Sequence, residues 1–122
     1  MKVRGEFVAV IKSFEEIESW KESRILCSFV YKSLTSKKDY SYNDQLKRAS
    51  VSIMNNIAEG FERQTNKGFK QFLYIAKGSP SEVRSMSLLG LELGYFSKSD
   101  SDYIYSQTVK ISKLLPGLIK VL

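Results

Sequence analysis

Seven basic residues between positions 47 and 84 give this chain its clearest potential chemistry, which is contact with phosphate groups. Lysine and arginine side chains neutralise the phosphates of RNA or DNA without reading the base sequence. The same residue types also form ordinary solvated helix surfaces, and the sequence alone leaves that alternative open. The seven residues are Lys47, Arg48, Arg63, Lys67, Lys70, Lys77 and Arg84.

The overall charge agrees with a polyanionic partner but does not require one. The 122 residues include 19 lysines and arginines against 13 aspartates and glutamates, so the formal net charge is +6. A basic balance of this size favours nucleic acid only moderately, because many proteins without that role are equally basic.

Candidates for catalysis are few. Glu59 with Glu62 or Glu82 forms a pair of carboxylates, but nothing in the sequence places such a pair in a cleft. Ser79 follows Gly78 as a nucleophile might be expected to, yet the chain contains no histidine to activate it. The single cysteine can form neither an internal disulfide nor a zinc cluster. We therefore predict a protein that is not an enzyme and that uses no metal ion or cofactor.

A second set of residues predicts packing between helices. Arg48, Ser52, Asn56 and Glu59 recur at helical spacing and mix short polar groups with charges of both signs. Such a stripe suits a hydrogen-bonded network against another helix, in which Arg48 and Glu59 pair within a protomer or across a subunit contact. The expected structural and oligomer network comprises Ser52, Asn56, Glu59, Gly60, Gly78, Ser79 and Glu82.

Four amphipathic helices are needed to position these residues. Apolar residues recur at steps of three and four in four segments of the chain. The predicted helices cover roughly residues 14–35, 42–63, 66–93 and 100–122. The clearest apolar stripe, in the second segment, is Leu46, Ala49, Ile53, Ile57 and Phe61. The first segment is expected to bury Ile17, Trp20, Cys27, Tyr31 and Leu34.

Short polar signals mark where the helices begin. A Ser followed three residues later by Glu or Asp has the spacing of a capping box or a weaker form of it. The expected start signals are Ser13 with Glu16, Ser41 with Asp44, Ser99 with Asp102, and either Thr65 or Asn66 for the third helix. Gly94 is the expected C-terminal cap of that third helix.

Proline and glycine leave several local alternatives. Pro80 either kinks the third helix or breaks it into two, and Pro116 either kinks or ends the fourth. Gly60 is either a close-packing point or the start of helix termination. Gly78, together with the serine after it, predicts a crossing point at which two helices approach closely.

These features predict an all-α fold, an antiparallel up-down four-helix bundle over residues 14–122 with an N-terminal extension over residues 1–13. No stretch approaches the ~18 consecutive apolar residues of a membrane span, so we expect no membrane partner and a cytoplasmic location.

Two long motifs carry a resemblance to a known family. Residues Lys47 to Gly60 read KRASVSIMNNIAEG and resemble R-R-A-x-x-S-I-x-x-N-I-A-E-G. Residues Phe69 to Glu82 resemble F-x-x-F-L-x-I-A-x-G-S-x-x-E. Lys47 stands where the first motif has arginine, which keeps the charge and loses the bidentate geometry.

With the LGY sequence at positions 93–95, these motifs resemble the four-helix bundle family of 23S rRNA intervening-sequence proteins. Accessory variability proteins of diversity-generating retroelements are relatives of that family. The resemblance implies a protomer that assembles into a ring-like homopentamer, and many members are encoded inside inserts in bacterial 23S rRNA genes. The retroelement relatives imply two further kinds of partner, a nucleic acid and a reverse transcriptase.

Aromatic residues lie among the basic ones, and two interpretations apply to them. Aromatic rings beside cations can stack bases, whereas rings at helical spacing usually belong to a core or a subunit interface. The residues concerned are Tyr40, Tyr42, Phe61, Phe69, Phe72 and Tyr74.

The sequence thus supports two hypotheses of different classes. The first is a non-enzymatic, oligomeric helical bundle that binds RNA or DNA electrostatically, because a ring of subunits multiplies the +6 charge. The second is a protein-interaction scaffold, such as an accessory of a reverse transcriptase, without direct contact to nucleic acid.

Overall fold

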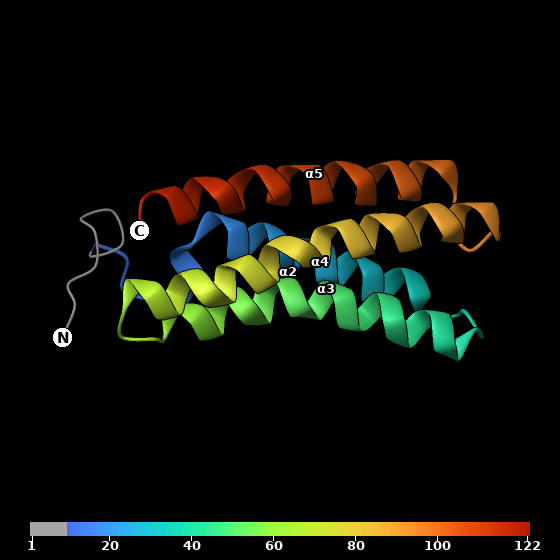
Figure 1. Cartoon of the computed structure of the whole chain (residues 1–122). Helices are drawn as coiled ribbons and strands as arrows, with labels where there is room; N and C mark the ends of the chain where they lie inside the picture. The colour runs from blue at the N-terminus through green and yellow to red at the C-terminus, as the bar shows by residue number, and fades with distance from the viewer. Residues whose placement is uncertain (1–9) are drawn as a thin grey trace.

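Four long helices make up the computed structural model, which describes residues 10–122 (Figure 1). The elements are a short 3-10 turn η1 (Phe14–Glu16) and the helices α2 (Glu18–Leu34), α3 (Tyr40–Phe61), α4 (Asn66–Glu92) and α5 (Lys98–Lys120). The prediction of an all-α fold with four helices is confirmed. Residues 1–9 of the expected N-terminal extension lie outside the described residues.

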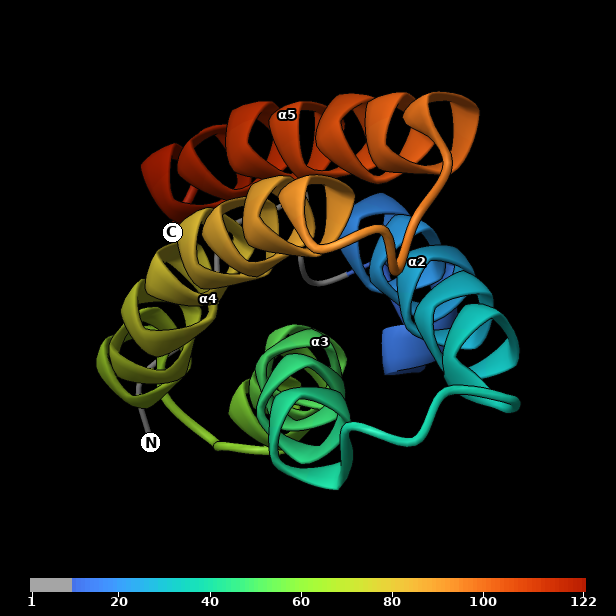
Figure 2. The same ribbon diagram turned by 90° about the vertical axis from the view of Figure 1, so that its right-hand side faces the viewer.

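The helices pack side by side around one shared core. α3 and α5 each contact both α2 and α4, so every helix has two neighbours (Figure 2). The start of α3 meets the end of α4 through Tyr42 and Met86, and the end of α3 meets the start of α4 through Gly60 and Phe69. None of the described helices combines the length and apolar composition that a bilayer crossing needs.

The apolar stripe predicted for α3 forms the centre of the core. All five of its residues are buried, and three of them, Leu46, Ile53 and Ile57, are fully buried. In α2 the prediction was wrong for Tyr31, which is 42% exposed. Leu26 and Val30 fill the core there instead, because they occupy the inward side of the helix at four-residue spacing.

Three helix starts differ from the predicted ones. Glu16 accepts the backbone N–H of Ser13, as the capping box requires, but this closes only η1. Ile17 then adopts an extended conformation with ψ 124°, so α2 begins at Glu18. The first helix is therefore not continuous from residue 14.

The caps of α3 and α5 each lie two residues before their predicted positions. Asp39 caps α3 by accepting the N–H of Tyr42, at 3.2 Å from Oδ1. Ser97 caps α5 by accepting the N–H of Asp100 at 3.0 Å. The prediction for α4 is confirmed, since Thr65 accepts the N–H of Gly68 at 3.1 Å.

Both prolines lie inside continuous helices. Pro80 is buried within α4, and Pro116 is exposed within α5. The alternatives in which Pro80 breaks the third helix and Pro116 ends the fourth are therefore wrong. Packing of the flanking turns against the core supplies the stability that a missing backbone hydrogen bond removes.

Glycine allows α3 and α4 to approach closely at both ends of their contact. A Cβ on Gly60 would lie 2.7 Å from Phe72 Cβ on α4, and a Cβ on Gly90 would collide with the Tyr42 hydroxyl on α3. The close-packing alternative for Gly60 is thus the correct one. Of the predicted crossing point at Gly78 and Ser79, the glycine half is wrong, because Gly78 is exposed and an added Cβ would meet nothing within 4 Å. The serine half is correct, because Ser79 is buried and its hydroxyl donates to Ser52 on α3.

Gly94 ends α4 as predicted, with φ +78° just after the last helical turn. The N–H of Tyr95 donates to the carbonyl of Gly90 at 2.7 Å, and the N–H of Gly94 donates to that of Leu91 at 3.1 Å. This pair of bonds is a Schellman motif, which requires a left-handed residue and therefore favours glycine.

Candidate nucleic-acid interface

Four of the seven predicted basic residues share one stripe along α4, here called the α4 basic stripe. Lys67, Lys70, Lys77 and Arg84 follow one another at steps of three and seven, which places them on one side of a helix. Lys67 and Lys77 are exposed, and Lys70 and Arg84 are half-buried. The stripe borders α5, because the Arg84 guanidinium carbon lies 5.5 Å from the ring centre of Tyr105.

The charged side chains of this stripe are all positive. Between positions 67 and 84 the only acidic residue is Glu82, which is five residues after Lys77 and two before Arg84. At about 100° per residue, that spacing turns Glu82 away from the stripe. No acidic side chain therefore lies among these cations to neutralise the positive potential that they create in the solvent.

The other three basic residues are not part of the stripe: Lys47 and Arg48 lie on α3, and Arg63 follows the end of that helix. The Lys47 ammonium lies 5.0 Å from the ring centre of Tyr31 on α2, and Arg48 is exposed. The Arg63 guanidinium lies 4.6 Å from the ring centre of Phe72 and 3.8 Å from a carboxylate oxygen of Glu59. The seven predicted residues thus divide into one stripe and three separate positions.

The predicted polar network joins α3 to α4 at mid-length. Asn56 Nδ2 donates to the carbonyl of Ser52 at 2.8 Å and to its hydroxyl at 3.1 Å. The Ser79 hydroxyl on α4 donates to the same Ser52 hydroxyl at 3.1 Å. Glu59 pairs with Arg63 on the exposed surface rather than with Arg48.

Sequence reasoning missed a second polar cluster, at the end of the bundle where α3 begins. The Tyr42 hydroxyl donates to the carbonyl of Met86 at 2.5 Å, and the Tyr95 hydroxyl donates to Asp39 Oδ2 at 2.6 Å. The bond from Tyr95 lowers the pKa of Asp39, and the same bond raises the pKa of Tyr95. Burial raises the pKa of Tyr42 to about 12, so its hydroxyl stays protonated.

A buried carboxylate between α2 and α5 was also missed. Glu22 accepts hydrogen bonds from Lys110 at 3.1 Å and from the Gln107 side chain at 3.3 Å. The bond from Lys110 lowers the pKa of Glu22. Only the seven-residue spacing of Ile104 and Ile111 hinted that Gln107, between them, also faces inward.

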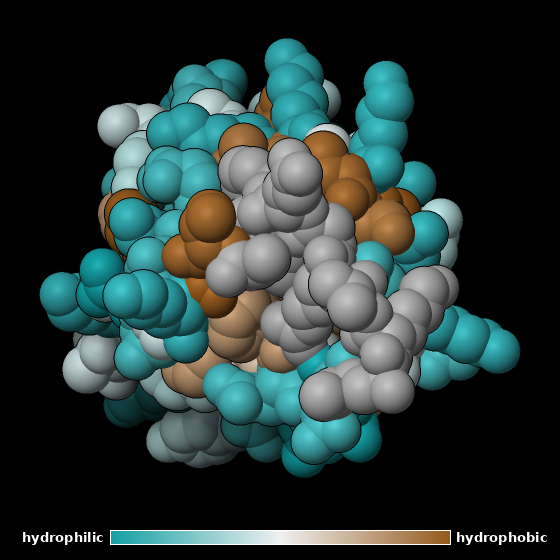
Figure 3. Space-filling model, turned by 90° about the vertical axis from the view of Figure 1, so that its left-hand side faces the viewer, coloured by the Kyte–Doolittle hydropathy of each residue, from teal (hydrophilic) through white to brown (hydrophobic). Residues whose placement is uncertain are grey.

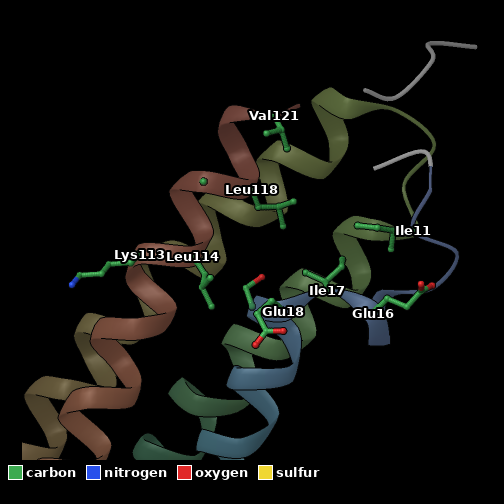
Figure 4. Close-up of a pocket in the computed structure, with 10 residues that line it drawn as sticks. Ile11, Glu16, Ile17, Glu18, Lys113, Leu114, Leu118 and Val121 are labelled. Carbon is green, nitrogen blue, oxygen red and sulfur yellow. The ribbon is translucent and has the colours of Figure 1, made fainter. Parts of the chain in front are cut away.

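A pocket of about 380 Å³ lies between the start of α2 and the end of α5. Hydrophobic side chains gather at this end of the bundle (Figure 3). Ile17 and Leu118 line the pocket, and the Lys113 side chain extends away from them (Figure 4). The Glu16 carboxylate accepts hydrogen bonds from the backbone N–H groups of Lys12 and Ser13. Most of the described residues that line the pocket are apolar, so it is suited to apolar contact.

The described residues also contain no group suited to a metal ion. Within residues 10–122, no three Cys, Asp or Glu side chains lie close enough together to hold one. The buried thiol of Cys27 accepts a hydrogen bond from the Ser50 hydroxyl at 3.6 Å.

Comparison with known families decides where this chain belongs. The sequence model of the 23S rRNA-intervening sequence protein family matches residues 15–117. The chain belongs to this family. The matched residues of this 23S rRNA-intervening sequence protein include α2, α3, α4 and most of α5, and so contain the α4 basic stripe and the polar network.

A solved structure with the same fold is similar to this 23S rRNA-intervening sequence protein. It is a protein with unknown function from the S23 ribosomal protein family of Bacteroides thetaiotaomicron VPI-5482, with 25% sequence identity and a TM-score of 0.77. The match covers 84% of this chain and 98% of that chain. No curated protein matches the chain.

Proposed function

We propose that this protein is a non-enzymatic, antiparallel up-down helical bundle that assembles into an oligomer and binds RNA or DNA through the α4 basic stripe. The observation that carries the proposal is the row formed by Lys67, Lys70, Lys77 and Arg84 on one side of α4, without an acidic residue in it. Cations in such a row bind the phosphates of a polynucleotide and release its counterions.

Oligomerisation supports the electrostatic mechanism. One protomer carries a formal charge of +6, and a ring-like homopentamer would present five copies of the stripe. Several weak phosphate contacts on one assembly bind a long polynucleotide far more tightly than one contact does, because later contacts form at high effective concentration. We therefore expect binding to strengthen with the length of the nucleic acid.

The test is binding of the purified protein to labelled RNA and DNA across a series of salt concentrations. We expect micromolar or tighter binding at physiological salt, with log Kd rising linearly with log salt concentration. The double variant Lys67→Glu with Lys70→Glu should abolish binding and leave helical content unchanged, since Lys67 is exposed and Lys70 is half-buried.

A matched control separates the stripe from net charge. Lys21→Glu with Lys32→Glu makes the same charge change on exposed positions of α2, which does not pack against α4. We expect this control to keep most of the affinity. Equal losses in both double variants would mean that total charge, and not the stripe, governs binding. No binding even at low salt would contradict the proposal.

A second candidate function is a protein-interaction scaffold, for which a reverse transcriptase is one expected partner. The observation in its favour is a set of exposed apolar residues on α4, since large apolar groups in solvent favour protein contacts. They are Ile75, Leu88 and Leu89 within the helix and Leu93 directly after it, which are 55%, 50%, 43% and 51% exposed. Partner binding that persists at high salt, without affinity for nucleic acid, would support this function.

A further inference from the structure

One aromatic ring lies in the middle of the α4 basic stripe and faces solvent. Tyr74 is four residues after Lys70 and three before Lys77, so it lies between these cations on the same side of the helix. Its side chain is exposed, at 57%, and the Lys77 ammonium lies 6.0 Å from its ring centre. A tyrosine in this position adds nothing to the core.

A second ring flanks the same stripe from α5. Tyr105 is 46% exposed, and the Arg84 guanidinium lies 5.5 Å from its ring centre. Arg84 also donates to the Ser81 hydroxyl at 3.4 Å, which helps to hold the guanidinium over the ring. The guanidinium and the ring are both planar groups, and each is of a kind on which bases can stack.

Most of the other aromatic residues near the basic positions have structural roles. Tyr42, Phe61 and Phe69 are buried, and Phe72 is half-buried beneath Arg63. Tyr74 is different, because the fold leaves more than half of its surface in water and no other residue of the described range 10–122 forms a hydrogen bond with its hydroxyl. The ring of Tyr74 is therefore available to stack against a ligand.

We infer that the α4 basic stripe takes unpaired nucleic acid, with bases stacked on Tyr74 and on the Tyr105–Arg84 surface while the lysines hold the phosphates. This inference rests on the proposed function and narrows it to one class of substrate. Exposed rings add binding energy only when bases are free to leave a helix. In a duplex the bases are already stacked inside, and only the phosphates meet the stripe.

The dimensions of the stripe suit a short single strand. Arg84 comes seventeen positions after Lys67. At 1.5 Å per residue, the stripe is about 26 Å long. Single-strand sites in other proteins take about 4–16 nucleotides, so an oligonucleotide of about 12 is long enough to cover the stripe.

The experiment compares three probes of one sequence: a single-stranded RNA of about 12 nucleotides, the same sequence as single-stranded DNA, and the RNA paired with its complement. We expect both single strands to bind more tightly than the duplex. The single strand with the higher affinity then shows whether RNA or DNA is the preferred ligand. Tyr74→Ala should weaken single-strand binding by about 5- to 150-fold and change duplex binding by less than about twofold.

Two control variants make the outcome decisive. Tyr74→Phe keeps the ring and should bind like the wild type, whereas a loss would mean that the hydroxyl, not stacking, matters. Tyr40→Ala removes a tyrosine that is 73% exposed at the start of α3 and should have no effect. Circular dichroism and thermal unfolding should be unchanged in all three variants, since both side chains are exposed.

Each unfavourable result is distinguishable. Equal affinity for single strands and duplex, with no effect of Tyr74→Ala, would overturn the inference and leave the proposed function intact, provided that the lysine variants still fail to bind. Absence of binding to every probe would instead overturn the proposed function, and the inference with it.

Discussion

The hydroxyl of Tyr95 donates a hydrogen bond of 2.6 Å to Asp39 Oδ2 and so joins the segment between α4 and α5 to the N-terminal cap of α3. Asp39 uses its other oxygen, Oδ1, to accept the N–H of Tyr42. The rings of Tyr42 and Tyr95 meet edge to face, with 5.0 Å between their centres. One carboxylate therefore serves both a local cap and a contact across 56 residues of sequence.

Tyr95→Phe is expected to destabilise the fold in a pH-dependent way. The bond from Tyr95 lowers the pKa of Asp39, so it contributes stability above the unfolded pKa of Asp39 and loses it as pH falls through the folded value. The difference in unfolding free energy between wild type and variant should therefore be largest near neutral pH and shrink in acid. Urea unfolding in steps from pH 7 down to about pH 2 measures it. A difference that does not change with pH would contradict this role for Asp39.

Gly90→Ala should lower the unfolding free energy by about 1–3 kcal/mol through overpacking. The added Cβ would collide with the Tyr42 hydroxyl and would lie 2.7 Å from a ring carbon of Phe96. Gly78→Ala is the matched control in the same helix, where the added methyl meets nothing within 4 Å. That control should gain about 0.5–1 kcal/mol, because alanine favours the helix. Chemical denaturation of both variants checks the opposite signs.

Lys110→Ala should reduce stability at neutral pH by about 0.5–1 kcal/mol, because the Lys110 side chain is 55% exposed and Glu22 retains Gln107. The bond from Lys110 lowers the pKa of Glu22, so its contribution holds above the unfolded pKa and disappears as pH falls through the folded value. Lys113→Ala, on the same helix, should have little effect at any pH. An equal loss for Lys110→Ala at neutral and acid pH would show that packing, not charge, is responsible.

Cys27 should react slowly with thiol reagents while the protein is folded. Burial raises the pKa of its thiol, which leaves little of the reactive thiolate near neutral pH, and its side chain is 7% exposed. Labelling with an aromatic disulfide should proceed at a rate set by opening of the bundle and become rapid in concentrated urea. Rapid, complete labelling of the native protein would contradict this placement of Cys27.

Sequence periodicity found the helices because the core positions of α3 are apolar without exception along its central stripe. It missed buried hydroxyl residues elsewhere, since these satisfy their own hydrogen bonds on the preceding turn. Ser23 donates to the carbonyl of Ser19 at 2.6 Å, and Ser50 donates to that of Lys47 at 2.9 Å. A polar residue at such a position is predicted to be exposed, although its side chain is fully buried in the structure.

The errors at helix starts and in the candidate site have different causes. Asp39 lies in a stretch with several residues that could cap a helix. Its contact with Tyr95 joins residues far apart in the sequence, so local spacing cannot predict it. Lys47 and Arg48 look like one patch because they are neighbours in sequence. On a helix, neighbours point about 100° apart, so Lys47 turns toward α2 while Arg48 faces solvent.

The close approaches at Gly60 and Gly90 also restrict how this protein can move. Each glycine gives room to the other helix at one end of the α3–α4 contact, and Ser52 with Ser79 joins the helices between them. A slip of one helix by a turn, about 5.4 Å, would bring side chains to the places where only a glycine fits. We therefore expect α3 and α4 to move together as one unit in any change of state on binding.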